Sequence, residues 1–284
     1  MVTNNSLVNA APSNSHLRPA VLSPLALTTA EHEPALPRAE RESTVSLIIP
    51  TRNEARNVAD VLERVPDMVS EVLIVDTRSS DVTRLMARST LPDIRIIEEP
   101  KRGKGYALRA GLAAATGDVL VAMDADGSMS PEEIPRLVNP LLHGFDFTKG
   151  SRFMGGGNSL DITPIRGLGN WGLTKLVNVL FKARFTDLCY GFFAVRRIFL
   201  DALDLSSTGF EIETEIVLRA ERKGLRIAEV PSVELPRRNG RSNLHAGKDG
   251  IRVVRTILAE YRASRAPEQL PAPTSPSIYA SRGS

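Results

Sequence analysis

Two aspartates near the middle of the chain, Asp124 and Asp126, directly follow a short apolar run over residues 119–123. A continuous apolar run of this length is typical of a strand buried on both faces of a parallel sheet. Side chains two residues apart on an extended segment point the same way, so the two carboxylates can converge at the strand's carboxyl end. Converging carboxylates suit a hard divalent cation that neutralises a diphosphate. Taken alone, however, this spacing is more typical of an ordinary acidic turn.

Polar side chains also gather at the carboxyl ends of the other strands predicted in the first half. They are Thr51 to Glu54, Asp76, Lys104, Asp124 and Asp126. Scattered surface polarity would not segregate in this way, and the carboxyl edge of an open α/β sheet is where such sheets bind ligands. The pattern therefore predicts one ligand cleft at this edge.

Two of these residues have alternative interpretations. Asp76 can accept hydrogen bonds from a nucleobase or a ribose, or it can cap the following helix. Lys104 lies in a Gly103-Lys104-Gly105 turn before a helix, where glycines allow close backbone approach and the helix N-terminus favours anions. A plain tight turn is the alternative, because the spacing matches neither a Walker motif nor the dinucleotide-binding fingerprint.

The second half of the chain adds candidates with equally open interpretations. Arg152 follows a short predicted strand and could hold a phosphate or face solvent. Asp187 lies in an apolar context and could serve as a general base or bind backbone amides. A basic, glycine-containing loop could close over a phosphate or be an ordinary exposed loop. Its arginines are Arg237, Arg238 and Arg241.

The elements that must position these residues alternate strand and helix. Short apolar, β-branched runs predict strands over residues 45–49, 72–75, 94–97, 119–123 and 146–149. Helices with apolar residues at three- and four-residue spacing follow each of the first four strands. On the second of these helices, Val82, Leu85 and Met86 should face inward. Four strand–helix units in a row imply an α/β fold with a mainly parallel sheet flanked by helices.

The rest of the chain is less regular. Its predicted elements are helices over 167–183, 210–222 and 249–261, a strand over 192–195 and an extended segment over 225–235. Glu211, Glu213 and Glu215 cannot all share one helix face, so at least one of them should be solvated. The Pro- and Ser-containing ends, residues 1–43 and 265–284, are expected to be a disordered leader and tail around a folded domain at 44–264.

Composition narrows the class of protein. The 284 residues carry a net charge of +3, are 42% apolar and 5% aromatic, and include a single cysteine. No basic run is interleaved with aromatics, so we expect anionic substrates or an anionic membrane face as partners, and no nucleic acid. The cysteine count indicates a reducing compartment and a cytoplasmic location. No apolar run approaches the ~20 residues that span a bilayer, and the N-terminus lacks a signal-peptide pattern.

Taken together, the segments resemble the family 2 inverting glycosyltransferases, which have a nucleotide-sugar-binding α/β domain of the glycosyltransferase A type. Within that family they are most similar to the dolichol-phosphate and polyprenyl-phosphate sugar transferases. Thr77 departs from the second acid of many relatives, and Ser128 from a glutamine of several polyprenyl-phosphate enzymes. The matching motifs, in the family's order over about residues 44 to 260, are Ile49-Pro50-Thr51-Arg52-Asn53-Glu54, Val75-Asp76, Ser79-Ser80-Asp81, Gly103-Lys104-Gly105, Gly117-Asp118, Asp124-Ala125-Asp126-Gly127, Lys149-Gly150-Ser151-Arg152, Thr186-Asp187-Leu188-Cys189-Tyr190-Gly191-Phe192 and Gly240-Arg241-Ser242-Asn243-Leu244.

The resemblance implies a nucleoside diphosphate sugar donor and a role for each matched residue. Asp124 and Asp126 would form the metal motif, with Asp126 the direct ligand of Mg²⁺ or Mn²⁺. Arg152 would lie near the diphosphate or the acceptor phosphate, and Asp187 on the acceptor side, where it becomes the candidate base if the acceptor is a hydroxyl. The nucleoside pocket would be lined by Pro50, Arg52, Glu54 and Asp76, with Lys104 near it. The loop that closes on the substrate would contain Arg237, Arg238 and Arg241.

The acceptor and some alternatives remain open. A polyprenyl phosphate is the acceptor that the resemblance favours. A retaining transferase of the glucosyl-phosphoglycerate synthase kind would share the sheet and the Asp-x-Asp motif. A nucleotidyltransferase would be expected to carry a glycine-rich loop after the first strand, which residues 50–56 lack. A non-catalytic nucleotide-sugar-binding protein is compatible with the departure at Thr77.

Membrane contact is a further expectation. Residues 173–185 are apolar and carry Lys175, Lys182 and Arg184. They could form an interfacial helix that holds the protein peripherally at the inner face of a membrane, although a buried core helix is the more common explanation.

Overall fold

The computed structural model describes residues 43–240 and 244–265, and all structural statements concern these residues. The predicted leader and tail lie outside them, apart from residues 43 and 265, and so does Arg241. Contacts divide the chain into residues 1–41 and 42–284, and only the second unit contains described residues.

Within the described residues, one sheet of seven strands has the order β3-β2-β1-β4-β7-β5-β8. Strand β7 runs antiparallel to its neighbours β4 and β5, and the other pairings in this sheet are parallel. The predicted α/β fold with a mainly parallel sheet is therefore confirmed. The strands are β1 (Val45–Thr51), β2 (Glu71–Asp76), β3 (Arg95–Glu98), β4 (Val119–Ala122), β5 (Phe147–Ser151), β7 (Phe193–Arg196) and β8 (Ile227–Pro231), while β6 (Asn158–Ser159) and β9 (Val233–Glu234) pair separately.

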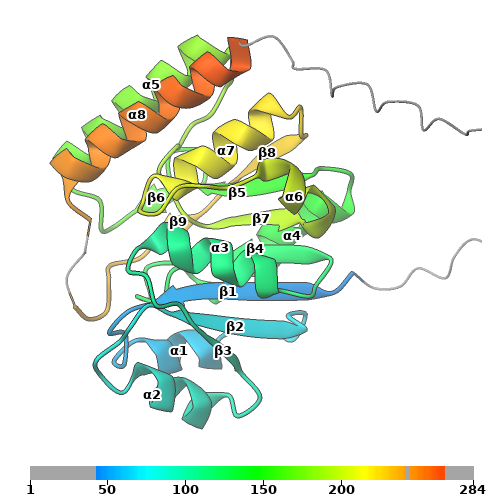
Figure 1. Cartoon of the computed structure of the whole chain (residues 1–284), viewed down its shortest axis with the longest axis vertical. Helices are drawn as coiled ribbons and strands as arrows, with labels where there is room; N and C mark the ends of the chain where they lie inside the picture. Colours follow the sequence, from blue (N-terminus) through cyan, green and yellow to red (C-terminus); the bar gives the residue numbers. More distant parts are fainter. Residues whose placement is uncertain (1–42, 241–243, 266–284) are drawn as a thin grey trace, which may run out of the picture. The chain divides into compact units, whose positions relative to one another are not determined.

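Helices cover both faces of the large sheet (Figure 1). In β1, Leu47 and Ile49 pack in one core cluster with α1, α2 and α4, whereas Ile48 packs in the other with α3, α5, α7 and α8. Burial on both faces explains why the run is apolar without alternation. The helices are α1 (Val58–Glu63), α2 (Thr83–Thr90), α3 (Lys104–Ala114), α4 (Ile134–Leu142), α5 (Pro164–Phe181), α6 (Leu200–Leu203), α7 (Ile212–Arg222) and α8 (Ala246–Arg265), with 3₁₀ turns η1 at Pro131–Glu133 and η2 at Arg197–Phe199.

Helix α2 shows where the apolar pattern was misleading. Val82 and Leu85 are 55% and 63% exposed, so the prediction that they face inward was wrong. Thr83 and Ala87 are buried instead. The hydroxyl of Thr83 binds the Asp81 carboxylate and accepts a 2.9 Å hydrogen bond from the backbone N–H of Glu54. This polar anchor fixes the rotation of the helix, so that Val82 and Leu85 point outward while Met86 packs against the core as predicted.

Helices α5 and α8 lie side by side next to α7 (Figure 1). Of the apolar residues in the predicted 167–183 helix, Leu176 and Leu180 pack against the core. Val177 lies in the core, whereas Leu168, Trp171 and Val179 are exposed, so α5 buries one face, as the more common explanation requires, and leaves the other at the surface. In the part of the chain that the structure describes, no helix has both the length and the apolar composition needed to cross a bilayer.

Candidate active site

A cavity of about 160 Å³ opens at the carboxyl ends of β1, β2 and β4, the edge at which the sequence predicts a ligand cleft. Neighbouring parallel strands end on the same side of a sheet, which is why distant segments meet here. We call it the strand-end cavity; it is lined by Pro50, Thr51, Arg52, Glu54, Thr77, Gly103, Lys104, Ala107, Asp124, Ala125, Asp126, Phe210 and Arg237. From the predicted set it thus brings together Pro50, Arg52, Glu54, Lys104, Asp124, Asp126 and Arg237.

Lys104 joins two carboxylates at one wall of this cavity. Its Nζ lies 2.6 Å from Oδ1 of Asp124 and also contacts the carboxylate of Glu213. Burial alone would lower the pKa of Lys104, but the two carboxylates outweigh it and raise the pKa. Burial raises the pKa of Glu213, and Lys104 opposes this only in part. The lysine is therefore a fixed positive charge that orients Asp124.

Asp126 is held from two sides. Its Oδ1 accepts a 2.9 Å hydrogen bond from the backbone N–H of Ser128, and its Oδ2 lies 2.5 Å from Nη2 of Arg237. Gly127 has a φ of +77°, and the side chain of Arg238 packs within 3.3 Å of the place where a Cβ would stand. A glycine suits both the left-handed backbone and this close contact. The loop that carries Arg237 and Arg238 therefore lies against the Asp-x-Asp motif.

Glu54 lies close to both aspartates of the motif. Its Oε2 accepts a 2.6 Å hydrogen bond from Nδ2 of Asn57. Burial raises the pKa of Glu54, and the nearby carboxylates of Asp126 and Asp124 add to the rise. Asn57 also donates to the backbone carbonyl of Asn239, which ties the arginine loop to the start of α1.

Asp76 lies beneath the cavity lining, where the neighbouring Thr77 is the residue exposed to the cavity. Oδ2 of Asp76 accepts a 3.1 Å hydrogen bond from the backbone N–H of Ser79, which is the capping alternative. Its Oδ1 is buried without a hydrogen-bond partner among the described residues. One oxygen thus organises the turn after β2, and the other is an acceptor without a donor.

The glycines of the Gly103-Lys104-Gly105 turn make room for the protein's own backbone. The N–H of Gly105 donates to the carbonyl of Thr208 at 3.1 Å, and a Cβ at Gly103 or Gly105 would overlap the carbonyl oxygen of Thr208 or Ser207 respectively. The close approach that the sequence predicted is therefore to the 207–208 segment. It seats the start of α3, and with it Lys104, at the edge of the cavity.

The donor set at this edge fits a hard divalent cation. Within residues 43–240 and 244–265, no group of three or more His, Cys, Asp and Glu side chains is arranged to hold a metal. Asp124 and Asp126 can supply one or two carboxylate oxygens once Arg237 yields its position. Mg²⁺ and Mn²⁺ are commonly bound in this way, with phosphate oxygens and water completing the shell.

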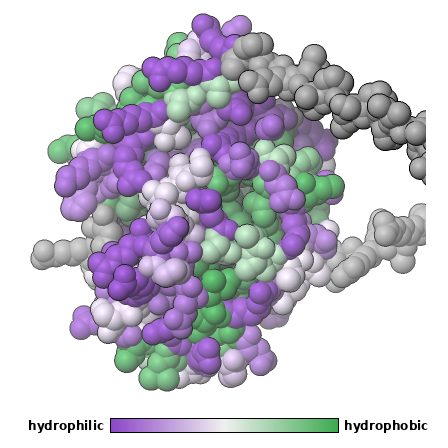
Figure 2. All heavy atoms as spheres, viewed as in Figure 1, coloured by the Kyte–Doolittle hydropathy of each residue, from purple (hydrophilic) through white to green (hydrophobic). Residues whose placement is uncertain are grey.

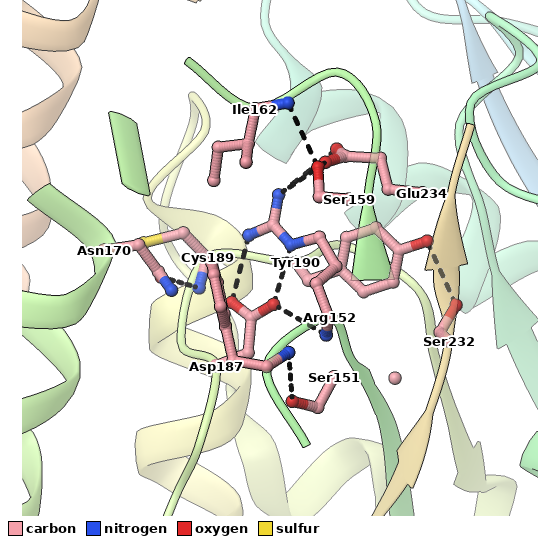
Figure 3. A network of polar contacts seen from close by, with 12 residues as sticks. Ser151, Arg152, Ser159, Ile162, Asn170, Asp187, Cys189, Tyr190, Ser232 and Glu234 are labelled. Carbon is pink, nitrogen blue, oxygen red and sulfur yellow. Dashed lines mark hydrogen bonds and ion pairs between the residues drawn. The ribbon is translucent and has the colours of Figure 1, made fainter. Parts of the chain in front are cut away.

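Arg152 lies apart from the strand-end cavity and lines a second cavity; Figure 3 shows its polar contacts. Its guanidinium donates to Asp187 from Nε at 2.7 Å and from Nη2 at 3.0 Å, and from Nη1 to both oxygens of Glu234 at 3.2 Å. The ring of Tyr190 stacks under it with 4.7 Å to the centroid. Two carboxylates thus neutralise the guanidinium, so Arg152 holds the wall of this cavity more than it offers a free charge to a phosphate.

Asp187 is fully buried, and Arg152 engages both of its carboxylate oxygens. Burial would raise the pKa of Asp187, but the Arg152 guanidinium outweighs it and holds the pKa below its usual value. A base must face the proton that it removes. The geometry therefore favours a structural role for Asp187, which binds the backbone N–H and the side chain of Arg152, over the role of a general base.

The expectation that one of Glu211, Glu213 and Glu215 is solvated was wrong, because all three are buried. Glu211 accepts from the backbone N–H groups of Thr208 and Gly209, and Glu215 from those of Ser206 and Ser207. These two acids hold the segment against which the Gly103–Gly105 turn packs. Glu213, on the remaining side, reaches Lys104 and is the site residue that sequence reasoning missed. The sequence did contain a signal for Glu213, because three acids at the start of an otherwise apolar helix are unusual unless they have buried partners.

Three comparisons with known proteins agree with this geometry. Residues 46–204 match the model of glycosyl transferase family 2. The chain is 35% identical to undecaprenyl-phosphate mannosyltransferase of Micrococcus luteus, over 74% of this chain and 91% of that protein. It is 34% identical to dolichol-phosphate mannosyltransferase of Pyrococcus furiosus, over 75% of this chain and 62% of that protein. Another curated relative is matched over 53% of its length, so this chain spans little more than half of some relatives.

The fold has solved counterparts. Glucosyl-3-phosphoglycerate synthase of Mycobacterium tuberculosis, in complex with Mn²⁺, uridine diphosphate and glucosyl-3-phosphoglycerate, superposes with a TM-score of 0.65 at 25% identity, covering 78% of this chain and 80% of that one. The predicted fold of the glycosyltransferase A type is thereby confirmed. On the matched segment and the two mannosyltransferase relatives, this chain belongs to glycosyl transferase family 2, in its polyprenyl-phosphate sugar transferase branch.

Proposed function

We propose that the chain transfers a hexosyl group from a nucleoside diphosphate sugar to a polyprenyl phosphate, with inversion at the anomeric carbon. The observation that carries the proposal is the convergence of Asp124, Asp126 and Lys104 on one cavity at the strand ends. The relatives named for undecaprenyl and dolichol phosphates support the acceptor class. The neighbour bound to Mn²⁺ and uridine diphosphate supports the donor class and the metal.

The donor would lie along the strand-end cavity. Asp124 and Asp126 would hold Mg²⁺ or Mn²⁺, which offsets the charge of the leaving diphosphate when bound. Lys104 keeps Asp124 in position. Glu54, in the cavity lining, offers an acceptor for N–H and O–H groups of the nucleoside, and the unpartnered Oδ1 of Asp76 lies buried beneath that lining.

In the transfer, an oxygen of the acceptor phosphate forms a bond to the anomeric carbon while the bond from that carbon to the β-phosphate oxygen breaks. The electron pair of the broken bond leaves with the diphosphate. The attacking oxygen is already anionic, so the step requires no base. This agrees with Asp187 being engaged by Arg152, and we assign Asp187 the role of positioning that arginine.

The test begins with the donor. A thermal-shift panel of UDP, GDP, CDP and dTDP and their sugars with Mn²⁺ should show one selectively stabilising base. Transfer to a short polyprenyl phosphate is then measured for wild type, Asp126→Ala and Asp93→Ala, the last being an exposed acid remote from the cavity lining. We expect Asp126→Ala to lose at least about a hundredfold in turnover and the control to lose none. Near-normal turnover by Asp126→Ala would remove the proposal.

A retaining reaction on phosphoglyceric acid is the second candidate, because the solved neighbours include synthases bound to that compound. The anomeric configuration of the product, read by NMR, separates the two. Ligand stabilisation without transfer to any acceptor would favour a non-catalytic nucleotide-sugar-binding protein instead.

A further inference from the structure

Helices α5 and α8 expose large apolar side chains on neighbouring surfaces (Figure 1). On α5, Ile165, Leu168 and Trp171 recur every three residues and Val179 follows eight residues after Trp171, about two turns on, so these residues share one side of the helix. Clustered exposed apolar residues indicate a contact surface. We call this surface the α5–α8 face and define it by Ile165, Leu168, Trp171 and Val179, which are 77%, 69%, 60% and 76% exposed, and by Ile251 and Leu258, which are 56% and 37% exposed.

The charges around these apolar residues have one sign. Among the described residues of the two helices, every exposed charged side chain is basic, namely Lys175, Lys248, Arg252, Arg255, Arg262 and Arg265, of which Arg252 is paired with Glu211 at 2.7 Å. The 18 residues of α5 include no acid. On α8, Asp249 accepts a hydrogen bond from the His245 backbone, and Glu260 is buried in ion pairs with Arg219 and Arg222. Figure 2 shows hydrophilic and apolar residues interleaved over these helices.

A groove between α5 and α8, about 800 Å³ in volume, runs through this face. It shares Gly169 and Leu173 with the second cavity, about 330 Å³, which reaches inward to Arg152 and Glu213. Glu213 contacts Lys104 of the strand-end cavity. A mainly apolar path therefore leads from the face to the wall of the donor site.

We infer that the α5–α8 face docks on the surface of an anionic lipid bilayer, with α5 lying in the interfacial plane. The apolar stripe enters the headgroup–acyl boundary, and the surrounding lysines and arginines contact anionic headgroups. Trp171, an apolar ring with a polar N–H, suits this boundary. The inference rests on the proposed function in that a membrane-held acceptor needs an enzyme at the bilayer. Charge complementarity selects the bilayer over other apolar partners.

The experiment uses the full chain, in which Trp171 is the single tryptophan and thus a local reporter. Its emission is recorded with vesicles of phosphatidylcholine alone and of phosphatidylcholine with phosphatidylglycerol. We expect a blue shift and quenching by brominated lipid with the anionic vesicles, both weakened by salt. Binding elsewhere on the chain would leave this reporter unquenched, and that outcome overturns the inference.

Matched variants separate this face from other exposed apolar residues. Leu168→Asp combined with Val179→Asp should weaken vesicle binding at least about tenfold. Ile198→Asp, at a residue 79% exposed in η2, should leave it unchanged. Lys175→Gln combined with Arg255→Gln should weaken binding several-fold, whereas Lys223→Gln beyond α7 should not. Equal effects of face and control variants would contradict the inference.

Two further outcomes are informative. Sedimentation velocity tests for a concentration-dependent dimer that Leu168→Asp abolishes. Such a dimer would assign the α5–α8 face to a second copy of the chain and overturn the inference that it docks on a bilayer. Vesicle binding is measured without donor or acceptor. An absence of vesicle binding would therefore not contradict the proposed transfer reaction, and an absence of transfer in detergent would not contradict the proposed docking surface.

Discussion

Nη2 of Arg237 lies 2.5 Å from Oδ2 of Asp126, so the arginine occupies the side of the carboxylate that a metal ion needs. Arg237 reaches this position from a loop that is anchored independently. Arg238 pairs with Asp60 at 2.7 Å, and Asn239 exchanges hydrogen bonds with Asn57. The loop can thus stay in place while one side chain leaves the carboxylate.

Removing that side chain should favour the metal. A charge-assisted hydrogen bond contributes about 1.5–3 kcal/mol, part of which an incoming cation must replace. We expect nucleotide-free Arg237→Gln to bind Mn²⁺ about tenfold more tightly than wild type, as measured by the EPR signal of free Mn²⁺. Arg238→Gln, which lies on the same loop but pairs with Asp60, is the matched control and should bind like wild type. Unchanged or weaker binding by Arg237→Gln would show that Arg237 does not compete with the metal.

A substitution at Gly191 would test the ion pair between Lys104 and Glu213. A Cβ at Gly191 would overlap the Glu213 carboxylate and stand 2.9 Å from Nζ of Lys104. We expect Gly191→Ala to destabilise the protein by about 1–3 kcal/mol through overpacking and to lower kcat/KM about tenfold or more, because Asp124 loses its fixed cation. Denaturant unfolding and steady-state transfer measure the two effects.

The control for Gly191→Ala is another glycine-to-alanine change. Gly167 lies inside α5, and a Cβ there would meet nothing within 4 Å. Gly167→Ala should therefore stabilise the protein by about 0.5–1 kcal/mol with kcat/KM unchanged. If both variants behaved alike, the wall formed by Lys104 and Glu213 would have no part in transfer.

The ion pair between Asp187 and Arg152 predicts how the stability of the protein depends on pH. Arg152 holds the pKa of Asp187 below its ordinary value of 3.8, so the carboxylate's contribution to stability is fully present above pH 3.8 and is lost as the pH falls through the folded-state pKa. Asp187→Asn should cost about 3–5 kcal/mol at neutral pH, because it leaves Arg152 with an unpaired charge. The difference in unfolding free energy between wild type and Asp187→Asn should shrink in acid, which urea unfolding at neutral pH and at acidic pH would measure.

Asp161→Asn is the comparison for that experiment. Asp161 lies 3.9 Å from Arg166 in a pair that is 29% exposed on both sides, so its removal should change stability by less than about 1 kcal/mol. A difference between wild type and Asp187→Asn that stayed constant across the pH range would contradict the ion-pair account.

The first half of the fold follows from local patterns. Apolar runs mark β1, β2 and β4, and their parallel pairing places Glu54 and Asp124 at one edge because parallel strands end on the same side. The cavity residues that follow β1, β2 and β4 could therefore be grouped from the order of strands and helices, whereas Phe210 and Arg237 reach the cavity from the second half of the chain.

What the sequence could not provide were the partners of those residues. Lys104 meets Glu213 across 109 positions, and Arg152 meets Glu234 across 82. No local period encodes such pairs. On α2, one hydrogen-bonding threonine, Thr83, outweighed the apolar spacing of Val82 and Leu85.

Strand β7 runs antiparallel to β4 and β5, so at the edge where those two strands end, β7 begins. Phe193, at the start of β7, pairs with Ala122, at the end of β4. The parallel strands deliver the loops that follow them, whereas β7 delivers the loop that precedes it, with Asp187, Tyr190 and Gly191. Side chains thus reach this edge from opposite directions along the sequence, so an insertion before β7 would change the surroundings of Arg152 without lengthening the segments that follow β1 and β4.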